Sequence, residues 1–413
     1  MRTLRRPACL ALLLLSACTF PNHRHDLRVW EELRDGDDLS LALHQSVGLE
    51  LKDGNQADLI MNGAIFDEMV KEIEAAQSSI HIVTFIWRPS RPSDQLIEAL
   101  AKRRENVDCR IIVDPVGSID FADQVRMRLV GIGCDVRYFR PLGPGSRTKI
   151  RARNHRKMLI VDGYRGITGG FGIWKSWEGE GLTPDEWRET NVRVVGPAVR
   201  DMQLAFAENW QEVGGPLLPA DAFPDIPCMG PARAAFVGSS QSATISAAER
   251  MTALVIAAAK YRLWIENAYF IPSTAISDML VVKSKHGVDV RVVAPGPIHD
   301  WPPVRAAQRT TYDRLLEVGV RIWEYQPSMM HAKTMLVDDR FVVVGSTNFD
   351  PLSLKLMEEG SLIVEDPALA AGLDQAFRGD VGHSKEITRA SWERRNLVER
   401  MARQLTGLIG GFL

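Results

Sequence analysis

The sequence predicts an α/β protein made of two tandem α/β/α sandwich domains, each with a mixed β-sheet and related to the other by a pseudo-twofold axis. Three observations support this prediction. Strand-like and helix-like segments alternate along the chain, which is typical of a sheet covered by helices. The same order of segments occurs twice. The length of 413 residues, with 45% hydrophobic and 25% charged residues, suits two folded domains.

Apolar runs identify the strands of each copy, and amphipathic segments between them identify the helices. In the first copy we expect a helix at 67–76, a strand at 79–87, a helix at 94–103, a strand at 108–113, a helix at 121–130 and a strand at 134–139. In the second copy we expect a helix at 246–260, a strand at 262–271, a helix at 273–284, a strand at 288–293, a helix at 305–318 and a strand at 320–325.

A proline-rich segment separates the two copies, and five prolines within it give the composition of a linker. At the C-terminus, Leu397, Met401 and Leu405 recur at helical spacing, so a helix there would pack on its own domain or lie in a membrane interface. The predicted division is residues 1–17 as a signal peptide, 45–213 as the first domain, 214–231 as the linker, 232–381 as the second domain and 382–413 as a C-terminal amphipathic helix.

The N-terminus has the organisation of an export signal. Positive residues precede a short apolar run at 8–15, which is much shorter than the roughly 20 residues of a membrane-spanning helix. Cys18 then follows small residues, which resembles a bacterial lipobox and implies acylation of its thiol. We expect a lipoprotein anchored to a membrane outside the cytoplasm, in the periplasm, and Thr19 favours the outer membrane by the same analogy. Plain secretion with unmodified Cys18 is the alternative.

The overall charge argues against a dedicated nucleic-acid binder. The 50 Lys and Arg residues are balanced by 52 Asp and Glu residues, so the formal net charge is −2, whereas gripping a phosphate backbone normally takes a basic excess. A basic run at 147–156 could steer anionic lipid headgroups or simply face solvent. Cys109 and Cys134 each begin a strand-like run, so a disulfide would form only if those strands are neighbours.

Each copy contains the same unusual set of polar residues. The first set is His155, Lys157 and Asp162, and the second is His331, Lys333 and Asp338, each in an H-x-K-x4-D pattern. On a strand, alternate side chains share a face, so each histidine and its lysine should serve one site. The aspartates, seven residues after their histidines, should face the other side and brace the following turn.

Two such sets brought together would form a phosphoryl-transfer site. One imidazole can attack phosphorus while the other protonates the leaving alkoxide, because the unperturbed pKa of histidine is close to neutrality. The two lysines would neutralise the phosphate oxygens, so the design needs neither a cofactor nor a metal ion. The histidines at 81, 286 and 299 lack a partner at metal-ligand spacing, and no metal site is expected.

The twin motif, with Gly345-Ser346-x-Asn348 after its second copy, is the signature by which the chain is identified as a member of the phospholipase D superfamily. The signature includes both aspartates, which are therefore grouped with the catalytic residues. The chain resembles bacterial cardiolipin synthases most closely, over about residues 50 to 410. Stretches that carry this resemblance include Glu266-Asn-Ala-Tyr-Phe-Ile-Pro272 and Met330-His-Ala-Lys-Thr334.

The resemblance implies a two-step phosphatidyl transfer through a phosphohistidine, with superfamily precedent favouring His155 as the nucleophile. It also implies that an acidic residue downstream of each motif orients that motif's histidine; the matching residues are Glu189 and Glu359. Further implied phosphate-binding positions are Gly169, Gly170, Ser346 and Asn348. Gly172 replaces an asparagine that is common after the first motif, so one phosphate hydrogen bond could be lost there.

We therefore expect a phosphatidyltransferase of cardiolipin synthase type. Its partners would be phospholipids, namely phosphatidylglycerol and, as a second candidate, phosphatidylethanolamine, and it would act as a membrane-tethered monomer without nucleic acid. Three alternatives stay open: a hydrolytic phospholipase D that releases phosphatidic acid, an exported phosphodiesterase or nuclease, and a non-catalytic lipid-binding lipoprotein.

Overall fold

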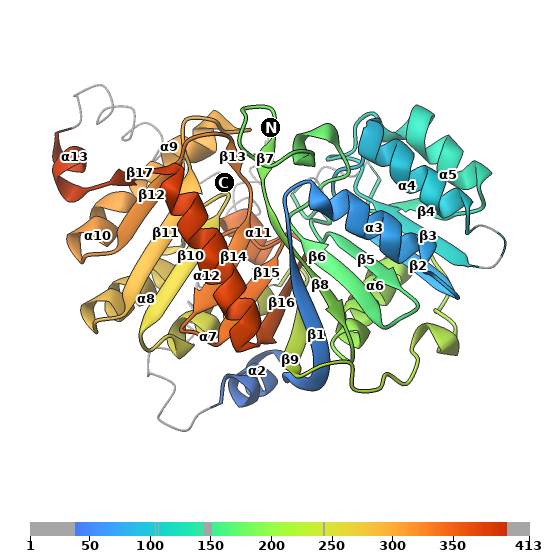
Figure 1. The fold of residues 1–413 in the computed structure, drawn as a ribbon, viewed down its shortest axis with the longest axis horizontal. Helices are drawn as coiled ribbons and strands as arrows, with labels where there is room; N and C mark the ends of the chain where they lie inside the picture. Colours follow the sequence, from blue (N-terminus) through green and yellow to red (C-terminus); the bar gives the residue numbers. More distant parts are fainter. Residues whose placement is uncertain are drawn as a thin grey trace, which may run out of the picture.

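The computed structural model describes residues 38–394, except residues 104, 106, 142, 144–150 and 243. Within this part of the chain, a single 15-stranded sheet runs through the molecule with helices on both faces (Figure 1). The order of its strands is β17-β12-β11-β10-β14-β15-β16-β9-β1-β8-β6-β5-β2-β3-β4. The mixed α/β fold expected from the sequence is confirmed.

The first half of the chain forms one wing of this sheet. Its elements are α2 (Leu39–Val47), β1 (Lys52–Met61), α3 (Ala64–Glu74), β2 (Ser79–Thr84), α4 (Arg91–Ala101), β3 (Asp108–Val113), a π-helical turn (Ala122–Arg126), α5 (Met127–Gly131), β4 (Asp135–Tyr138), β5 (Met158–Val161), β6 (Arg165–Gly169), a 3-10 turn (Lys175–Trp177), β7 (Trp187–Arg188), β8 (Thr190–Val195) and α6 (Val199–Glu212). A 3-10 turn (Ala220–Ala222) lies in the segment that leads to the second half.

The second half forms the other wing. Its elements are β9 (Ala232–Ser239), α7 (Ala247–Ala258), β10 (Arg262–Asn267), α8 (Thr274–Lys285), β11 (Asp289–Pro295), α9 (Pro302–Thr310), α10 (Tyr312–Glu317), β12 (Arg321–Tyr325), β13 (Met329–Met330), β14 (Lys333–Val337), β15 (Phe341–Gly345), α11 (Pro351–Lys355), β16 (Glu359–Glu365), α12 (Pro367–Gly382), β17 (Ser384–Ile387) and α13 (Arg389–Glu393).

The two wings repeat one topology outward from the centre. The order β1-β8-β6-β5-β2-β3-β4 in one wing corresponds to β9-β16-β15-β14-β10-β11-β12 in the other. The strands β2, β3 and β4 of one wing and β10, β11 and β12 of the other are parallel, and the strands between them and the centre are antiparallel. The internal duplication predicted from the sequence is thus visible in the strand order.

The two sheets are joined, which the prediction of two tandem sandwiches did not include. β1 and β9 pair antiparallel at the centre, with a register irregularity between Lys52 and Asn55. Without this pairing, each wing would present an unpaired inner edge of backbone N–H and C=O groups. The last long helix of each half also crosses the junction, because α6 contacts β9 and α12 contacts β1.

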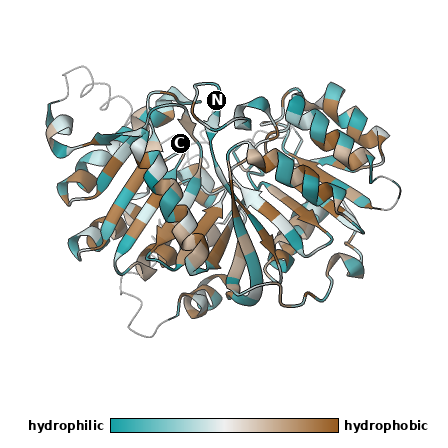
Figure 2. Cartoon of the chain, viewed as in Figure 1, coloured by the Kyte–Doolittle hydropathy of each residue, from teal (hydrophilic) through white to brown (hydrophobic). Residues whose placement is uncertain are grey.

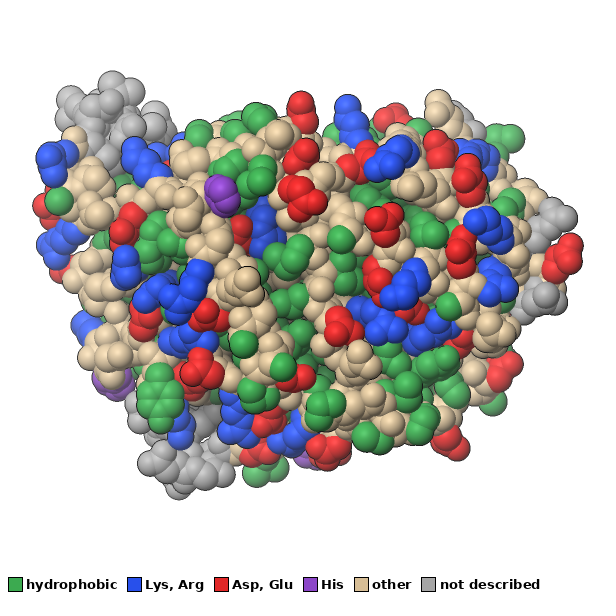
Figure 3. All heavy atoms as spheres, in the orientation of Figure 1, with side chains coloured by type: hydrophobic (Ala, Val, Ile, Leu, Met, Phe, Trp, Pro, Cys, Tyr) green, Lys and Arg blue, Asp and Glu red, His purple; other side chains and the backbone are tan. Residues whose placement is uncertain are grey.

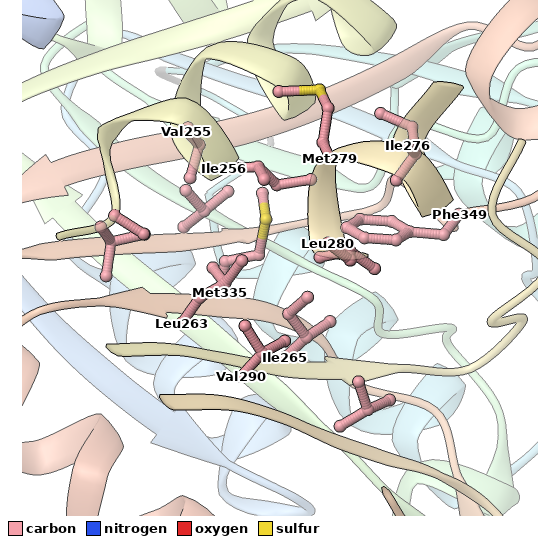
Figure 4. Close-up of a cluster of buried hydrophobic side chains, with 14 of the residues drawn as sticks. Val255, Ile256, Leu263, Ile265, Ile276, Met279, Leu280, Val290, Met335 and Phe349 are labelled. Atoms are coloured by element: carbon pink, nitrogen blue, oxygen red, sulfur yellow. The ribbon is translucent and has the colours of Figure 1, made fainter. Parts of the chain in front are cut away.

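Apolar side chains fill the space between the sheet and its helices, as the hydropathy colouring of the strands indicates (Figure 2). In the second wing, strand residues from β10, β11 and β14 face residues from α7 and α8 (Figure 4). The labelled members include Leu263, Ile265, Val290, Met335, Ile256, Leu280 and Phe349. Burial of such side chains contributes about 1.5–3 kcal/mol each, so this packing holds the strand ends that carry the site.

The predicted C-terminal helix from residue 382 is wrong at its beginning. β17 pairs antiparallel with β12 and covers the backbone groups of that sheet edge, so these residues are extended rather than helical. The short α13 follows, and its buried Trp392 lies 5.2 Å from the ring of Tyr312. Residues 395–413, with most of the apolar stripe, lie outside the described residues. No helix among the described residues is long and apolar enough to cross a membrane.

Cys109 and Cys134 form a disulfide, which the sequence left open. It ties β3 to the start of β4, and these strands are parallel neighbours. Cys228 is exposed and is the free cysteine of the described residues.

Replacing both Cys109 and Cys134 by serine should lower the free energy of unfolding by about 3 kcal/mol, because the 25-residue loop is no longer closed in the unfolded chain. Chemical denaturation of the oxidised protein checks this value, and Cys228→Ser serves as the control that should leave the midpoint unchanged. An unchanged midpoint in the double variant would contradict the prediction.

Candidate active site

The two halves exchange backbone segments next to their motifs. Met329 and Met330 of β13 pair with Trp187 and Arg188 of β7 in a parallel two-stranded sheet. Next to the first motif, an equivalent parallel bridge joins Asn154 to Glu358. The residue before His155 therefore lies beside the residue before Glu359, and the residue before His331 lies beside the residue before Glu189.

This exchange crosses the two histidine–glutamate pairs. His155 Nδ1 lies 2.9 Å from Glu359 Oε1, and His331 Nδ1 lies 2.6 Å from Glu189 Oε2. The expectation that each glutamate orients the histidine of its own motif is thus wrong. Each one holds the histidine of the opposite half, because the backbone pairings place it there; hydrogen bonds of 2.8 Å from the amides of His155 and His331 to the carbonyls of Glu358 and Arg188 fix this arrangement.

Both lysines lie against their own histidines. Lys157 Nζ donates to the His155 carbonyl over 2.7 Å, and Lys333 Nζ lies 2.9 Å from His331 Nδ1 and bonds to the His331 carbonyl. Their pKa values are lowered chiefly by burial, to about 7 for Lys157 and about 8 for Lys333, while Glu359 and Glu189 act in the opposite direction.

Burial also lowers the pKa of both histidines. The charge of each motif's lysine acts in the same direction, and the charge of His155 further lowers the pKa of His331. Two imidazoles, two lysines and two carboxylates therefore share one buried region, where burial disfavours the charged forms of the imidazoles and lysines. An anion such as a phosphodiester would stabilise the protonated lysines there, so the site favours an anionic ligand.

The two carboxylates have different hydrogen-bond donors. Glu359 accepts from the hydroxyls of Ser346 and Ser353. Burial alone would raise the pKa of Glu359, but His155, Lys157 and the Ser346 hydroxyl hold it below the ordinary value. Glu189 accepts instead from the indole N–H of Trp177 over 3.2 Å, and burial raises its pKa to about 7. The first carboxyl is therefore held as an anion, and the second can carry a proton near neutrality.

Most of the predicted phosphate-binding positions have a second role. A Cβ atom at Gly170 would lie 2.4 Å from Glu189 Oε2, and one at Gly169 would lie 2.2 Å from Asn191 Oδ1. These glycines therefore leave the space that the side chains of Glu189 and Asn191 occupy. Ser346 binds Glu359, as described above. Asn348 has a buried Oδ1 without a hydrogen-bond partner among the described residues. Phosphate binding by the four positions stays a prediction.

Asp162 and Asp338 are not part of the cluster, so their grouping with the catalytic residues is corrected. Asp162 accepts hydrogen bonds from the amides of residues 77–79, and Asp338 accepts them from the amides of residues 260–262. Both have positive φ, 54° and 52°, in the turns after β5 and β14. Each carboxylate therefore anchors the start of β2 or β10 beside its motif strand, the bracing role expected from its spacing.

Nothing in the sequence pattern pointed to Trp177 and Ser353 as hydrogen-bond donors to the glutamates. They stand at matching places in the two halves, each donating to the glutamate of its own half. Trp177 also explains the departure at Gly172: a Cβ atom there would lie 2.7 Å from its ring. The indole thus occupies the space that a side chain at Gly172 would need.

Aromatic rings border the histidines unequally. The ring of Phe85 lies 5.2 Å from that of His155, and the rings of Trp177 and Trp187 lie 5.3 Å and 4.8 Å from that of His331. Trp177 thus contacts the His331 ring and also donates to Glu189.

Two residues of the predicted basic run do not face solvent or lipid. Arg153 is 2% exposed and binds Asp114, and Arg156 is fully buried beside Glu358. They position the first motif by these ion pairs. Residues 144–150 lie outside the described part of the chain, as does Cys18. Among the residues described, no group of three His, Cys, Asp or Glu side chains is placed to hold a metal ion.

Relatives of known name share most of the chain. A cardiolipin synthase 2 of Staphylococcus epidermidis is 29% identical over 84% of this chain and 72% of its own length. A cardiolipin synthase A of Pseudomonas entomophila is 31% identical over 87% of this chain and 75% of its own. The phosphatidylserine synthase structure from Haemophilus influenzae Rd KW20 is 13% identical, has a TM-score of 0.68, and covers 91% of this chain and 97% of its own.

The family described as "Cardiolipin synthase, PLD-like domain" matches residues 69–210 and 254–381. These two segments contain both H-x-K motifs and both crossed glutamates. The chain therefore belongs to the phospholipase D superfamily, in the family of cardiolipin synthase PLD-like domains.

Proposed function

We propose that this protein is a phosphatidyltransferase of cardiolipin synthase type, which moves a phosphatidyl group to the hydroxyl of phosphatidylglycerol or another alcohol. The observation that carries the proposal is the crossed pair of histidine–glutamate contacts, with a lysine beside each histidine. It supplies a nucleophile, a proton donor and two cationic groups for one phosphodiester.

His155 would be the nucleophile. The Glu359 anion accepts its Nδ1–H, so the lone pair of Nε2 is available to attack phosphorus. As the Nε2–P bond forms, the P–O bond to the headgroup alcohol breaks. The Glu189–His331 pair holds the proton that this leaving oxygen takes up, because Glu189 can stay protonated near neutrality.

The second step reverses the proton transfer. A hydroxyl of the acceptor lipid gives its proton to the Glu189–His331 pair, its oxygen bonds to phosphorus, and the Nε2–P bond to His155 breaks. The ammonium groups of Lys157 and Lys333 offset the charge of the phosphoryl oxygens in both steps. Phosphatidylglycerol as acceptor gives cardiolipin, and water gives phosphatidic acid. Since one chain carries both motifs, a monomer suffices.

The nuclease alternative has less support. On the face shown in Figure 3, Lys and Arg side chains alternate with Asp and Glu side chains, without a continuous basic strip that would track a nucleic-acid backbone. The net charge of −2 agrees with this distribution.

We also propose that residues 1–17 are removed on export and that Cys18 is acylated, with the catalytic part tethered at a membrane in the periplasm, on the outer-membrane side as Thr19 suggests. Two or more acyl chains hold a protein stably on a bilayer, at about 0.8 kcal/mol per buried methylene. A tether of this kind would keep the active site close to its lipid substrates.

Purified protein with vesicles of phosphatidylglycerol should form cardiolipin and release glycerol, as mass spectrometry of the lipids can measure. His155→Ala and His331→Ala should each lower the rate by at least about 10³-fold, since each removes a group used in both steps. His331→Ala alone should retain phosphorus on the protein. Phosphatidic acid as the main product would favour a hydrolase, and phosphorus trapped on His155→Ala instead would reverse the two roles.

The rate constant kcat/KM should fall as the pH rises above about 7. Lys157 and Glu189, both with pKa values of about 7, lose their protons there, and the site loses one ammonium group and the proton of its acid. Initial rates with a soluble phosphodiester between pH 6 and 9.5, at constant ionic strength, check this without titrating a lipid surface. A rate that is flat or rises across this interval would contradict the assignment.

Expression of the full chain in a bacterium should yield a membrane-bound protein whose N-terminal peptide begins with acylated Cys18, because the lipobox-like segment directs this processing. Mass spectrometry of that peptide gives the result. Cys18→Ser should release the protein into the aqueous fraction, whereas Cys228→Ser should not. An N-terminal peptide that begins at Met1, or an unmodified Cys18, would overturn the lipoprotein proposal.

A further inference from the structure

A second polar cluster lies beside the His331 half of the site. Tyr269 donates from its hydroxyl to Asp300 Oδ2 over 2.6 Å, and the His299 ring stacks on that of Tyr269 at 5.6 Å. His299 Nδ1 lies 3.0 Å from Asp300 Oδ1 and accepts a hydrogen bond of 3.0 Å from the amide of Trp301. These side chains come from the segment after β10 and the loop after β11, and the mechanism above uses none of them.

The fold brings this cluster to the catalytic residues. In the antiparallel pairing of β10 with β14, Asn267 is opposite Lys333. Tyr269 follows Asn267 by two residues, so it lies at the end of β14 that begins with Lys333, next to His331. The negative charge of Asp300 raises the pKa values of His331 and Lys333 and so opposes the lowering caused by burial. His331 in turn lowers the pKa of Asp300.

The first half has no equivalent of the Tyr269 hydroxyl. β2 ends at Thr84 where β10 ends at Asn267, so the position that corresponds to Tyr269 is Ile86. The cluster therefore belongs to one side of the phosphodiester only. This is the side of His331, where the alcohol leaves and the acceptor hydroxyl enters.

The cluster presents an imidazole nitrogen and a carboxylate. His299 Nδ1 contacts both the Trp301 amide and Asp300 Oδ1, so Nε2 carries a proton in one tautomer of the ring and a lone pair in the other, and it can bond to a hydroxyl in either case. That nitrogen is buried, in a side chain only 1% exposed, and has no partner among the described residues. The Asp300 side chain is 25% exposed, and each of its carboxylate oxygens keeps a lone pair for another donor.

We propose that His299 and Asp300, positioned by Tyr269, form the subsite for the polyol headgroup of the alcohol that leaves or enters at His331. A glycerol headgroup has a hydroxyl beside the reacting one that can donate to the Asp300 carboxylate and form a hydrogen bond with His299 Nε2. A site built to bind a hydroxyl discriminates strongly against an analogue that lacks it.

The inference rests on the proposed function and is tested by competition between acceptors. Phosphatidylglycerol vesicles are incubated with equal concentrations of deuterated glycerol and 1-propanol, which has the same carbon skeleton without the two extra hydroxyls. Mass spectrometry gives the ratio of labelled phosphatidylglycerol to phosphatidylpropanol. The unaltered protein should favour glycerol at least about tenfold. Asp300→Asn and Tyr269→Phe should reduce that ratio to within about twofold of unity.

Two exposed positions near the start of β10 provide matched controls. Tyr261→Phe and Asp339→Asn make the same chemical changes at residues that are 75% exposed and, for the Asp339 side chain, 90% exposed. Both should keep the ratio of the unaltered protein. If Asp300→Asn is inactive, Tyr269→Phe decides the question.

The outcomes separate this inference from the proposed function. Active Asp300→Asn and Tyr269→Phe variants with an unchanged ratio, or an unaltered protein without preference for glycerol, would overturn the subsite. Selective transfer to glycerol without any cardiolipin would overturn the proposed function but leave the subsite standing. The absence of every lipid product with the unaltered protein would overturn both.

Discussion

The crossing of the two histidine–glutamate pairs is the constraint on which the structure depends. Neither half can orient its own histidine, because Glu189 serves His331 and Glu359 serves His155. The central pairing of β1 with β9, the small β7–β13 sheet and the helices that cross the junction all hold the halves in the one arrangement that satisfies both contacts. A site of this kind exists only when the whole repeat is assembled.

Burial is the main cost of such a site. Removing lysine and histidine from water disfavours their charged forms, and the carboxylates compensate only in part. The anionic phosphodiester would supply the missing negative charge. Substrate binding should therefore favour the protonated state of Lys157 and Lys333. This coupling makes the site selective for an anion over a neutral ligand.

The repeat has diverged where the chemistry of its halves differs. Two serine hydroxyls donate to Glu359, whereas an indole N–H and the Thr190 amide donate to Glu189. The same indole fills the space at Gly172, and a tyrosine with a hydroxyl corresponds to Ile86. A symmetric backbone would thus support the unsymmetric reaction proposed above, in which one histidine bonds to phosphorus and the other transfers protons beside the headgroup.

The order of helices and strands from α3 to β4 and from α7 to β12, the duplication and the residues of both motifs were predictable from the sequence, because periodicity and spacing are local properties. The bracing role of Asp162 and Asp338 followed from the same spacing. Which glutamate meets which histidine depended on pairing between segments 204 and 142 residues apart, and nothing local encodes it. The joining of the sheets and the edge strand β17 likewise arise from backbone edges that only the folded chain presents.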